Sequence, residues 1–164
     1  MKIFGKGLSE YFGFTKWFLV LILVVGITRL ALSLAGVPNS TDKWLSITVV
    51  LLIAVLYYGA RVHTSGFGSY KRLLPTYWTL TFTSQVFVAA AIVLAILTGH
   101  DNIFTAPEYS GGGDGKTWSH AGAHLLVGVV IAPLLAWLVG SVVMFIAKRI
   151  APAKGTPAAG AAQS

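Results

Sequence analysis

Four long apolar stretches, separated by polar connectors, constrain this chain more than any other feature of its sequence. They run over about residues 17–35, 44–61, 77–98 and 120–147. Crossing the hydrocarbon core of a bilayer takes about 20 helical residues, and backbone that faces lipid must satisfy its own hydrogen bonds. We therefore expect an all-α fold, an antiparallel four-helix transmembrane bundle that occupies residues 1–150 as one domain.

The cations lie mainly on one side of the alternating pattern that these stretches define. Nine of the twelve lysines and arginines share the side of the two termini: Lys2, Lys6, Lys16, Arg61, Lys71, Arg72, Lys148, Arg149 and Lys154. The other side carries two cations and four of the five acids: Lys43, Lys116, Asp42, Asp101, Glu108 and Asp114. Basic connectors are retained in the cytoplasm, so both termini are predicted to be cytoplasmic.

The composition points to the same surroundings. Hydrophobic residues make up 55% of the 164 positions and charged residues 10%, whereas soluble domains have roughly 25% charged residues. The net charge of +7 is expected to attract anionic lipid headgroups at the cytoplasmic face, because the cations flank apolar stretches. They form no soluble basic face, so nucleic acid is not an expected partner. We expect the protein to lie in a lipid bilayer, the inner membrane of a bacterium.

The two ends of the chain differ in composition from the apolar stretches between them. The tail, residues 151–164, is rich in alanine, glycine and proline and is predicted to be disordered in the cytoplasm. The first apolar stretch ends in Ser33, Leu34 and Ala35, which resembles the cleavage site of a secretory signal. Cleavage there would leave three helices. Arg29 and the long, weakly charged start argue against this alternative.

Arg29 is a charged residue inside an apolar stretch. At 1.5 Å per helical residue it lies roughly 10 Å below the outer end of its helix. A cation at that depth is costly and is a functional hypothesis by default, here the centre of a small solute or proton carrier. The structural alternatives are snorkelling to the outer headgroups or an ion pair with Asp42, Asp101 or Glu108.

The histidines of the outer side are candidate metal ligands. His120 and His124 are four residues apart, so they share one helix face. His100 and Asp101 end the third helix on the same side, and Glu108 follows them. Together these residues match the ligand types of zinc, copper or iron, and His100 with one of the other two histidines could hold a haem. A proton relay and plain hydrogen-bonded interfacial histidines remain alternatives.

Other polar positions predict structure. The connector over residues 99–119 is the longest on the outer side. Its segment 103–109 mixes apolar residues with an acid, which is typical of a plain interfacial loop, of a lid across the helix ends or of a docking surface. Gln85, in the third stretch, predicts an interhelical hydrogen bond, and Pro133 predicts a kink in the fourth helix.

No catalytic motif accompanies these features. The sequence has no Walker loop, nucleophile elbow or zincin motif, so we expect a non-enzymatic protein. The leading hypothesis is a small multi-pass membrane protein that acts through helix packing or its outer loop, as a homo-oligomer or with a membrane-protein partner. One alternative is a metal- or haem-binding redox component that uses the outer histidines. The other is a carrier centred on Arg29.

Overall fold

The computed structural model describes residues 2–42 and 45–151 of the chain. The elements in chain order are β1 (Lys2–Ile3), β2 (Lys6–Gly7), α1 (Leu8–Leu34), α2 (Asn39–Asp42), α3 (Ile47–Thr64), α4 (Tyr70–Thr98), α5 (Trp118–Leu126), the π-helical turn η1 (Val127–Ile131) and α6 (Ala132–Ile150). The protein is mostly helical. The predicted disordered tail lies outside the described residues, apart from Ala151.

Four helical segments in the described part of the chain are long and apolar enough to cross a membrane. They are α1, α3, α4 and the continuous run of α5, η1 and α6. The faces of these helices that have no helical neighbour expose large apolar side chains, such as Val24 on α1, Leu52 on α3 and Leu138 on α6. In water such continuous apolar surface would promote aggregation, whereas in a bilayer it contacts lipid tails. These features are those of a multi-pass membrane protein.

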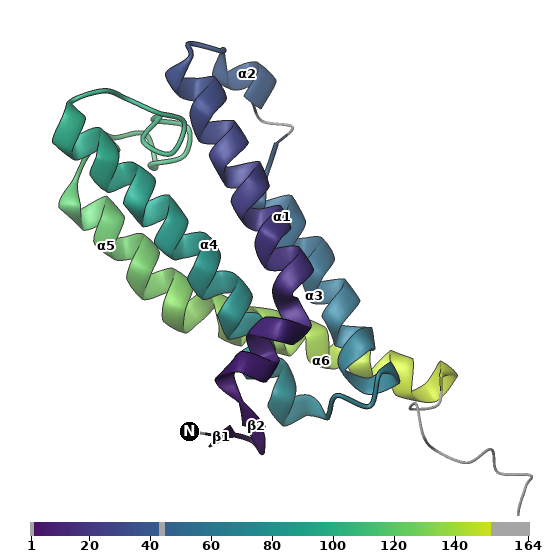
Figure 1. Ribbon diagram of the computed structural model, residues 1–164. Coiled ribbons are helices and arrows are strands. Elements are labelled where there is room, and N and C mark those ends of the chain that lie inside the picture. The colour runs from purple at the N-terminus through teal and green to yellow at the C-terminus, as the bar shows by residue number, and fades with distance from the viewer. Residues whose placement is uncertain (1, 43–44, 152–164) are drawn as a thin grey trace, which may run out of the picture.

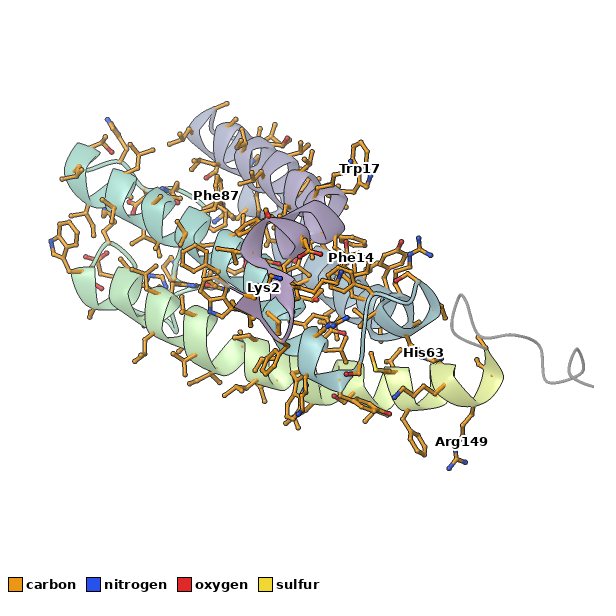
Figure 2. The ribbon with its side chains drawn as sticks, turned by 60° about the horizontal axis from the view of Figure 1, so that its bottom comes forward. Lys2, Phe14, Trp17, His63, Phe87 and Arg149 are labelled. Atoms are coloured by element: carbon orange, nitrogen blue, oxygen red, sulfur yellow. The ribbon has the colours of Figure 1, made fainter. Side chains whose placement is uncertain are left out.

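The long helices pack in three main contacts, α1 with α4, α3 with α6, and α4 with the α5–α6 segment. Figure 1 shows the strand pair and the connector between α3 and α4 at one end of the molecule. The short helix α2 and the connector between α4 and α5 lie at the opposite end, called the outer end below (Figure 1). In Figure 2, Trp17 and Arg149 point away from the helices, as expected for side chains that reach the lipid headgroups.

Three helices begin or end away from the limits of the apolar stretches. α1 begins at Leu8 instead of about residue 17, after Gly7, whose N–H donates to the Glu10 carboxylate at 2.7 Å. α3 covers residues 47–64 instead of 44–61. α4 begins at Tyr70, seven residues before the predicted start at 77, and includes Pro75. Hydropathy marks where lipid begins, whereas a helix continues through polar residues for as long as its backbone remains paired.

The N-terminal strand pair was not predicted from the sequence. β1 and β2 pair antiparallel, with Ile3 opposite Lys6, and the turn residues Phe4 and Gly5 have φ values of 50° and 84°. Positive φ at both central positions is typical of a tight type I′ hairpin. Two-residue strands are too short to give a period-two hydrophobic pattern, so the sequence carried no usable signal.

Small residues allow the helices to approach closely. A Cβ at Gly26 would overlap Phe87, and one at Gly140 would overlap Tyr77. Because Gly140 has no side chain, the Tyr77 ring fits beside it, and the Tyr77 hydroxyl donates to the Val55 carbonyl at 2.7 Å. Tyr58 and Tyr77 are both buried, although tyrosines near the ends of spanning helices often lie at the membrane interface. Buried tyrosines need an acceptor for the hydroxyl, and carbonyls of neighbouring helices supply it.

The fourth spanning segment changes its winding just before Pro133. The Ala132 N–H donates to the Val127 carbonyl, which is the i→i−5 bond of a π turn. A proline inside an α-helix clashes with the preceding turn and removes a donor, so a wider turn at this place relieves both problems. The sequence predicted a kink at Pro133, and the structure has the π turn η1 directly before this proline. This turn follows the helix that carries the two outer histidines.

Candidate metal centre

His120 and His124 lie one turn apart on α5. The hydroxyl of Thr117 accepts from the His120 N–H at 3.2 Å and caps the start of this helix. The two half-buried imidazoles face each other with their Nε2 atoms 3.2 Å apart. The local sequence therefore produces this pair by itself, because a spacing of four residues on a capped helix places both rings on one face.

The other nitrogen of each ring is held by a carbonyl oxygen. His124 Nδ1 lies 2.6 Å from Oε1 of Gln85 on α4, and His120 Nδ1 lies 2.9 Å from the backbone oxygen of Gly115. A carbonyl oxygen can only accept a hydrogen bond, so both Nδ1 atoms carry the hydrogen. The two Nε2 atoms then share one hydrogen when either ring is protonated, and when both rings are neutral they offer two lone pairs that a metal ion could accept.

Gln85 is fixed by the π turn. A Cβ on Gly128, in η1, would overlap the Gln85 side chain, so the glycine makes the room in which this amide lies. The interhelical hydrogen bond predicted for Gln85 is present, and its partner is a histidine. The amide thus orients a potential ligand, a role that the sequence did not indicate because it depends on how α4 and α5 pack together.

The structure brings together two of the five predicted metal ligands. Asp101 forms an ion pair with Lys116 at 3.0 Å, and Glu108 is exposed. His100 is exposed and lines a hollow whose walls do not include the histidines of α5. Residues 2–42 and 45–151 contain no group of three or more histidines and acids placed to hold one metal ion. The path of the outer loop, which spacing does not determine, separates these side chains.

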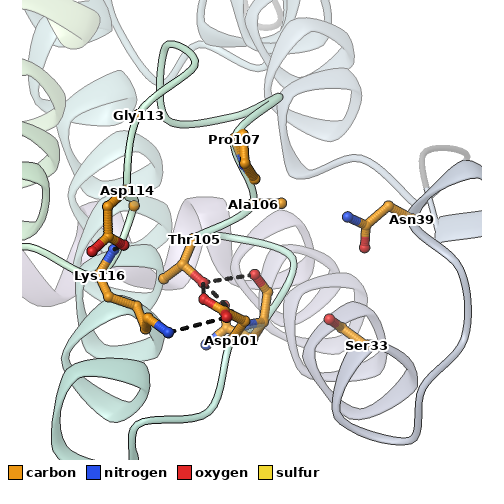
Figure 3. A pocket seen from close by; sticks show the side chains of 11 residues that line it. Ser33, Asn39, Asp101, Thr105, Ala106, Pro107, Gly113, Asp114 and Lys116 are labelled. Carbon is orange, nitrogen blue, oxygen red and sulfur yellow. Dashed lines mark hydrogen bonds and ion pairs between the residues drawn. The ribbon is translucent and has the colours of Figure 1, made fainter.

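The outer loop folds across the ends of the helices. Within it Ile103, Phe104 and Ala106 are buried, as a lid would be. Figure 3 shows the hollow of about 440 Å³ that remains between this loop and α1, with Ser33 and Asn39 on one side. Thr105 and Lys116 both contact Asp101 on the other side (Figure 3).

Arg29 is buried beneath this loop. Only 8% of its surface is exposed, which excludes snorkelling to the headgroups. Its guanidinium carbon lies 4.8 Å from the ring centre of Tyr109 and 5.7 Å from that of Phe104. Within the described residues it forms no ion pair, so Asp101 and Glu108 are not its counter-ions. The side chain of Asp42 lies outside what the structure describes.

His63 lies at the opposite end of the molecule from the other histidines. Its Nε2 is 3.1 Å from the carbonyl oxygen of Ala151, at the end of α6, and Figure 2 shows it beside that helix. It therefore takes no part in the outer cluster. Comparisons with known protein families, curated proteins and solved structures gave no match for this chain. The functional argument consequently rests on the geometry of the outer end.

Proposed function

We propose that this protein binds one transition-metal ion at the outer face of a bacterial inner membrane, through Nε2 of His120 and of His124. In this proposal the four spanning helices form an antiparallel bundle with both termini in the cytoplasm, as the distribution of cations favours. The observation that carries the proposal is the pair of Nε2 atoms 3.2 Å apart, each on a ring whose Nδ1 faces a carbonyl oxygen.

The separation of the two nitrogens suits a metal ion. With metal–nitrogen bonds of about 2.0–2.1 Å, atoms 3.2 Å apart subtend roughly 100° at the metal, close to the tetrahedral angle. Ligating histidines usually donate their second N–H to a carbonyl or carboxylate, and Gln85 and Gly115 supply such acceptors here. Two protein ligands leave the remaining positions to water or another small ligand. Divalent ions should bind in the usual order, with Cu²⁺ tighter than Zn²⁺.

The leading sequence hypothesis, action through helix packing or the outer loop, receives less support. Side chains of the same protein already pack against the small residues of the helices, so these positions are not available to a partner helix. They are Gly26, Gly128 and Gly140. The apolar residues of the outer loop are likewise buried in the protein itself. A carrier centred on Arg29 is also less supported, because Phe104 and Tyr109 lie over the guanidinium.

The test is a metal titration of the full-length protein, purified in detergent through a histidine-free tag. We expect one Cu²⁺ or Zn²⁺ bound per chain, measured by elemental analysis after desalting and by competition with a chromophoric chelator. His120→Ala and His124→Ala should each weaken binding by at least about tenfold, because each removes one of two ligands.

His100→Ala and His63→Ala are the matched controls, since each removes one imidazole outside the pair. Both should bind as the unmodified protein does. Absence of a bound ion, or equal loss of affinity from all four variants, would contradict the proposal. A monodisperse elution profile and an unchanged helical circular dichroism spectrum establish that each variant is folded.

A further inference from the structure

Two aromatic rings lie beside the Arg29 guanidinium, and no acidic side chain in the described part of the chain pairs with it. Its Nε is buried without a hydrogen-bond partner, while the rings of Phe104 and Tyr109 lie within 6 Å of its guanidinium carbon. Desolvated cation–π contacts are among the stronger ones, and a buried charge without them would be costly. The guanidinium and these rings therefore hold each other in place, and both rings belong to the outer loop.

The loop segment that carries Phe104 is rigid for a second reason. Asn102 donates from Nδ2 to the Ala91 carbonyl of α4 at 2.8 Å and accepts from the Phe104 N–H at 2.9 Å. The Thr105 hydroxyl lies 2.9 Å from the Asn102 carbonyl oxygen and 3.0 Å from its N–H. Residues 102–105 thus form a buried turn, called the asparagine turn below, which is fixed to α4 by Asn102 and to α1 by Arg29.

The asparagine turn contacts the part of the loop that holds His120. Gly115 packs against the backbone of Thr105 so closely that a Cβ there would overlap the Thr105 carbonyl. The carbonyl oxygen of the same glycine accepts from His120 Nδ1 at 2.9 Å. Lys116, the next residue, is tied to Asp101, beside the turn (Figure 3). A shift of the turn would therefore move the acceptor that orients His120.

We infer that Arg29 is a positioning residue for the outer metal centre. Arg29 holds Phe104, which belongs to the asparagine turn, and Tyr109, which follows the turn in the outer loop. The asparagine turn places the Gly115 carbonyl on His120. This inference rests on the proposed function and adds a regulator to the same site. Groups that orient metal ligands typically change metal affinity by 10–100-fold when they are removed. Because Arg29 acts through the loop, we expect an effect of about tenfold, at the low end of that range.

The experiment measures Cu²⁺ affinity and the Cu²⁺ electron paramagnetic resonance spectrum of Arg29→Met and Arg29→Lys. The methionine variant should bind about tenfold more weakly than the unmodified protein and show altered nitrogen hyperfine splitting, since His120 loses its fixed orientation. The lysine variant keeps the charge but loses the flat guanidinium, so it should recover part of the affinity. Arg61→Met, which removes an exposed arginine of α3, is the matched control and should bind normally.

Tyr109→Leu provides a second route in case Arg29→Met does not fold. Tyr109 is exposed at the loop surface, and its removal leaves Arg29 in place while deleting one of the two rings. This variant should also weaken Cu²⁺ binding. If the unmodified protein binds Cu²⁺ and the variants of Arg29 and Tyr109 bind it equally well, the positioning role is overturned and the proposed function stands. Unmodified protein that binds no metal would overturn both this role and the proposed function.

Discussion

Two arginines secure the two ends of this molecule in different ways. At the end that carries the strand pair, the Arg72 guanidinium donates to the carbonyl oxygens of Phe4 and Phe67 and so joins the strand pair to the connector before α4. At the outer end, Arg29 holds the loop by aromatic rings, with its Nε unpaired. The Arg72 side chain is half-buried, so part of it reaches the surface of the protein, whereas Arg29 is almost fully enclosed by the protein.

This difference predicts how each end of the molecule responds when its arginine is removed. Hydrogen bonds to backbone carbonyls satisfy a cation locally, so we expect the loss of Arg72 to affect only the strand pair and the connector that it joins. A buried cation held by rings depends on the loop remaining in place, and the loop depends on the cation. The outer end is therefore the more strongly coupled region, and it is also the region that carries the two imidazoles.

The largest effect should come from Gly115→Ala. The added Cβ meets the backbone of Thr105, which cannot move without displacing the asparagine turn. We expect a loss of about 2–3 kcal/mol in stability and a fall of at least about tenfold in metal affinity, from overpacking and from the misplaced acceptor. Thermal unfolding in detergent and metal titration measure the two effects.

Gly113→Ala is the control for that substitution, because a Cβ there meets nothing within 4 Å. It lies in the same loop and should leave both stability and affinity unchanged. If the two alanine variants behave alike, the outer loop is not a packed structure, and the contrast between the two ends fails.

The second effect concerns Gln85→Met. Methionine keeps the approximate shape of glutamine but offers no carbonyl, so His124 Nδ1 loses its acceptor. We expect metal affinity to fall by about 10–100-fold, with Zn²⁺ competition as the measurement. Thr83→Val, two residues away, removes a hydroxyl bonded within its own helix and should bind metal normally. Unchanged affinity in the methionine variant would mean that the amide does not orient the ligand.

Arg72→Met should have a smaller and purely structural effect. It frees the strand pair from the connector at a cost of about 1–2 kcal/mol, and it leaves metal affinity unchanged because the pair lies at the other end of the molecule. Limited proteolysis of residues 2–7 reports the release. A loss of metal affinity comparable to that of Arg29→Met would show that the two ends are coupled and would break the comparison.

The smallest effect is expected for Lys116→Met. Its ion pair with Asp101 lies at the surface, and exposed pairs contribute about 0–1 kcal/mol. We expect a change of less than about 0.5 kcal/mol in stability that disappears at high salt. A larger, salt-independent loss would indicate that this pair, more than Arg29, secures the outer loop.

Sequence patterns predicted part of the site. The spacing of His120 and His124 placed both rings together because that geometry is local to one helix. The grouping of His100, Asp101 and Glu108 with them was expected from shared depth alone, and depth does not decide which way a loop turns. Gln85 as the partner of His124 could have been suspected from a lone amide in an apolar stretch, but its partner depends on the packing at Gly128.

Three features follow from the amino-acid sequence alone: the four apolar helical segments, the separation of cations from acids, and the facing pair of histidines. Each follows from hydropathy, charge or helical period, which act over a few neighbouring residues. Three other features depend on how the helices and the outer loop pack: Arg29 lies beside two aromatic rings, Gly115 and Gln85 hold the imidazoles, and Tyr58 and Tyr77 are buried. These contacts join residues distant in sequence, and they depend on the close approach that glycines such as Gly128 and Gly140 permit.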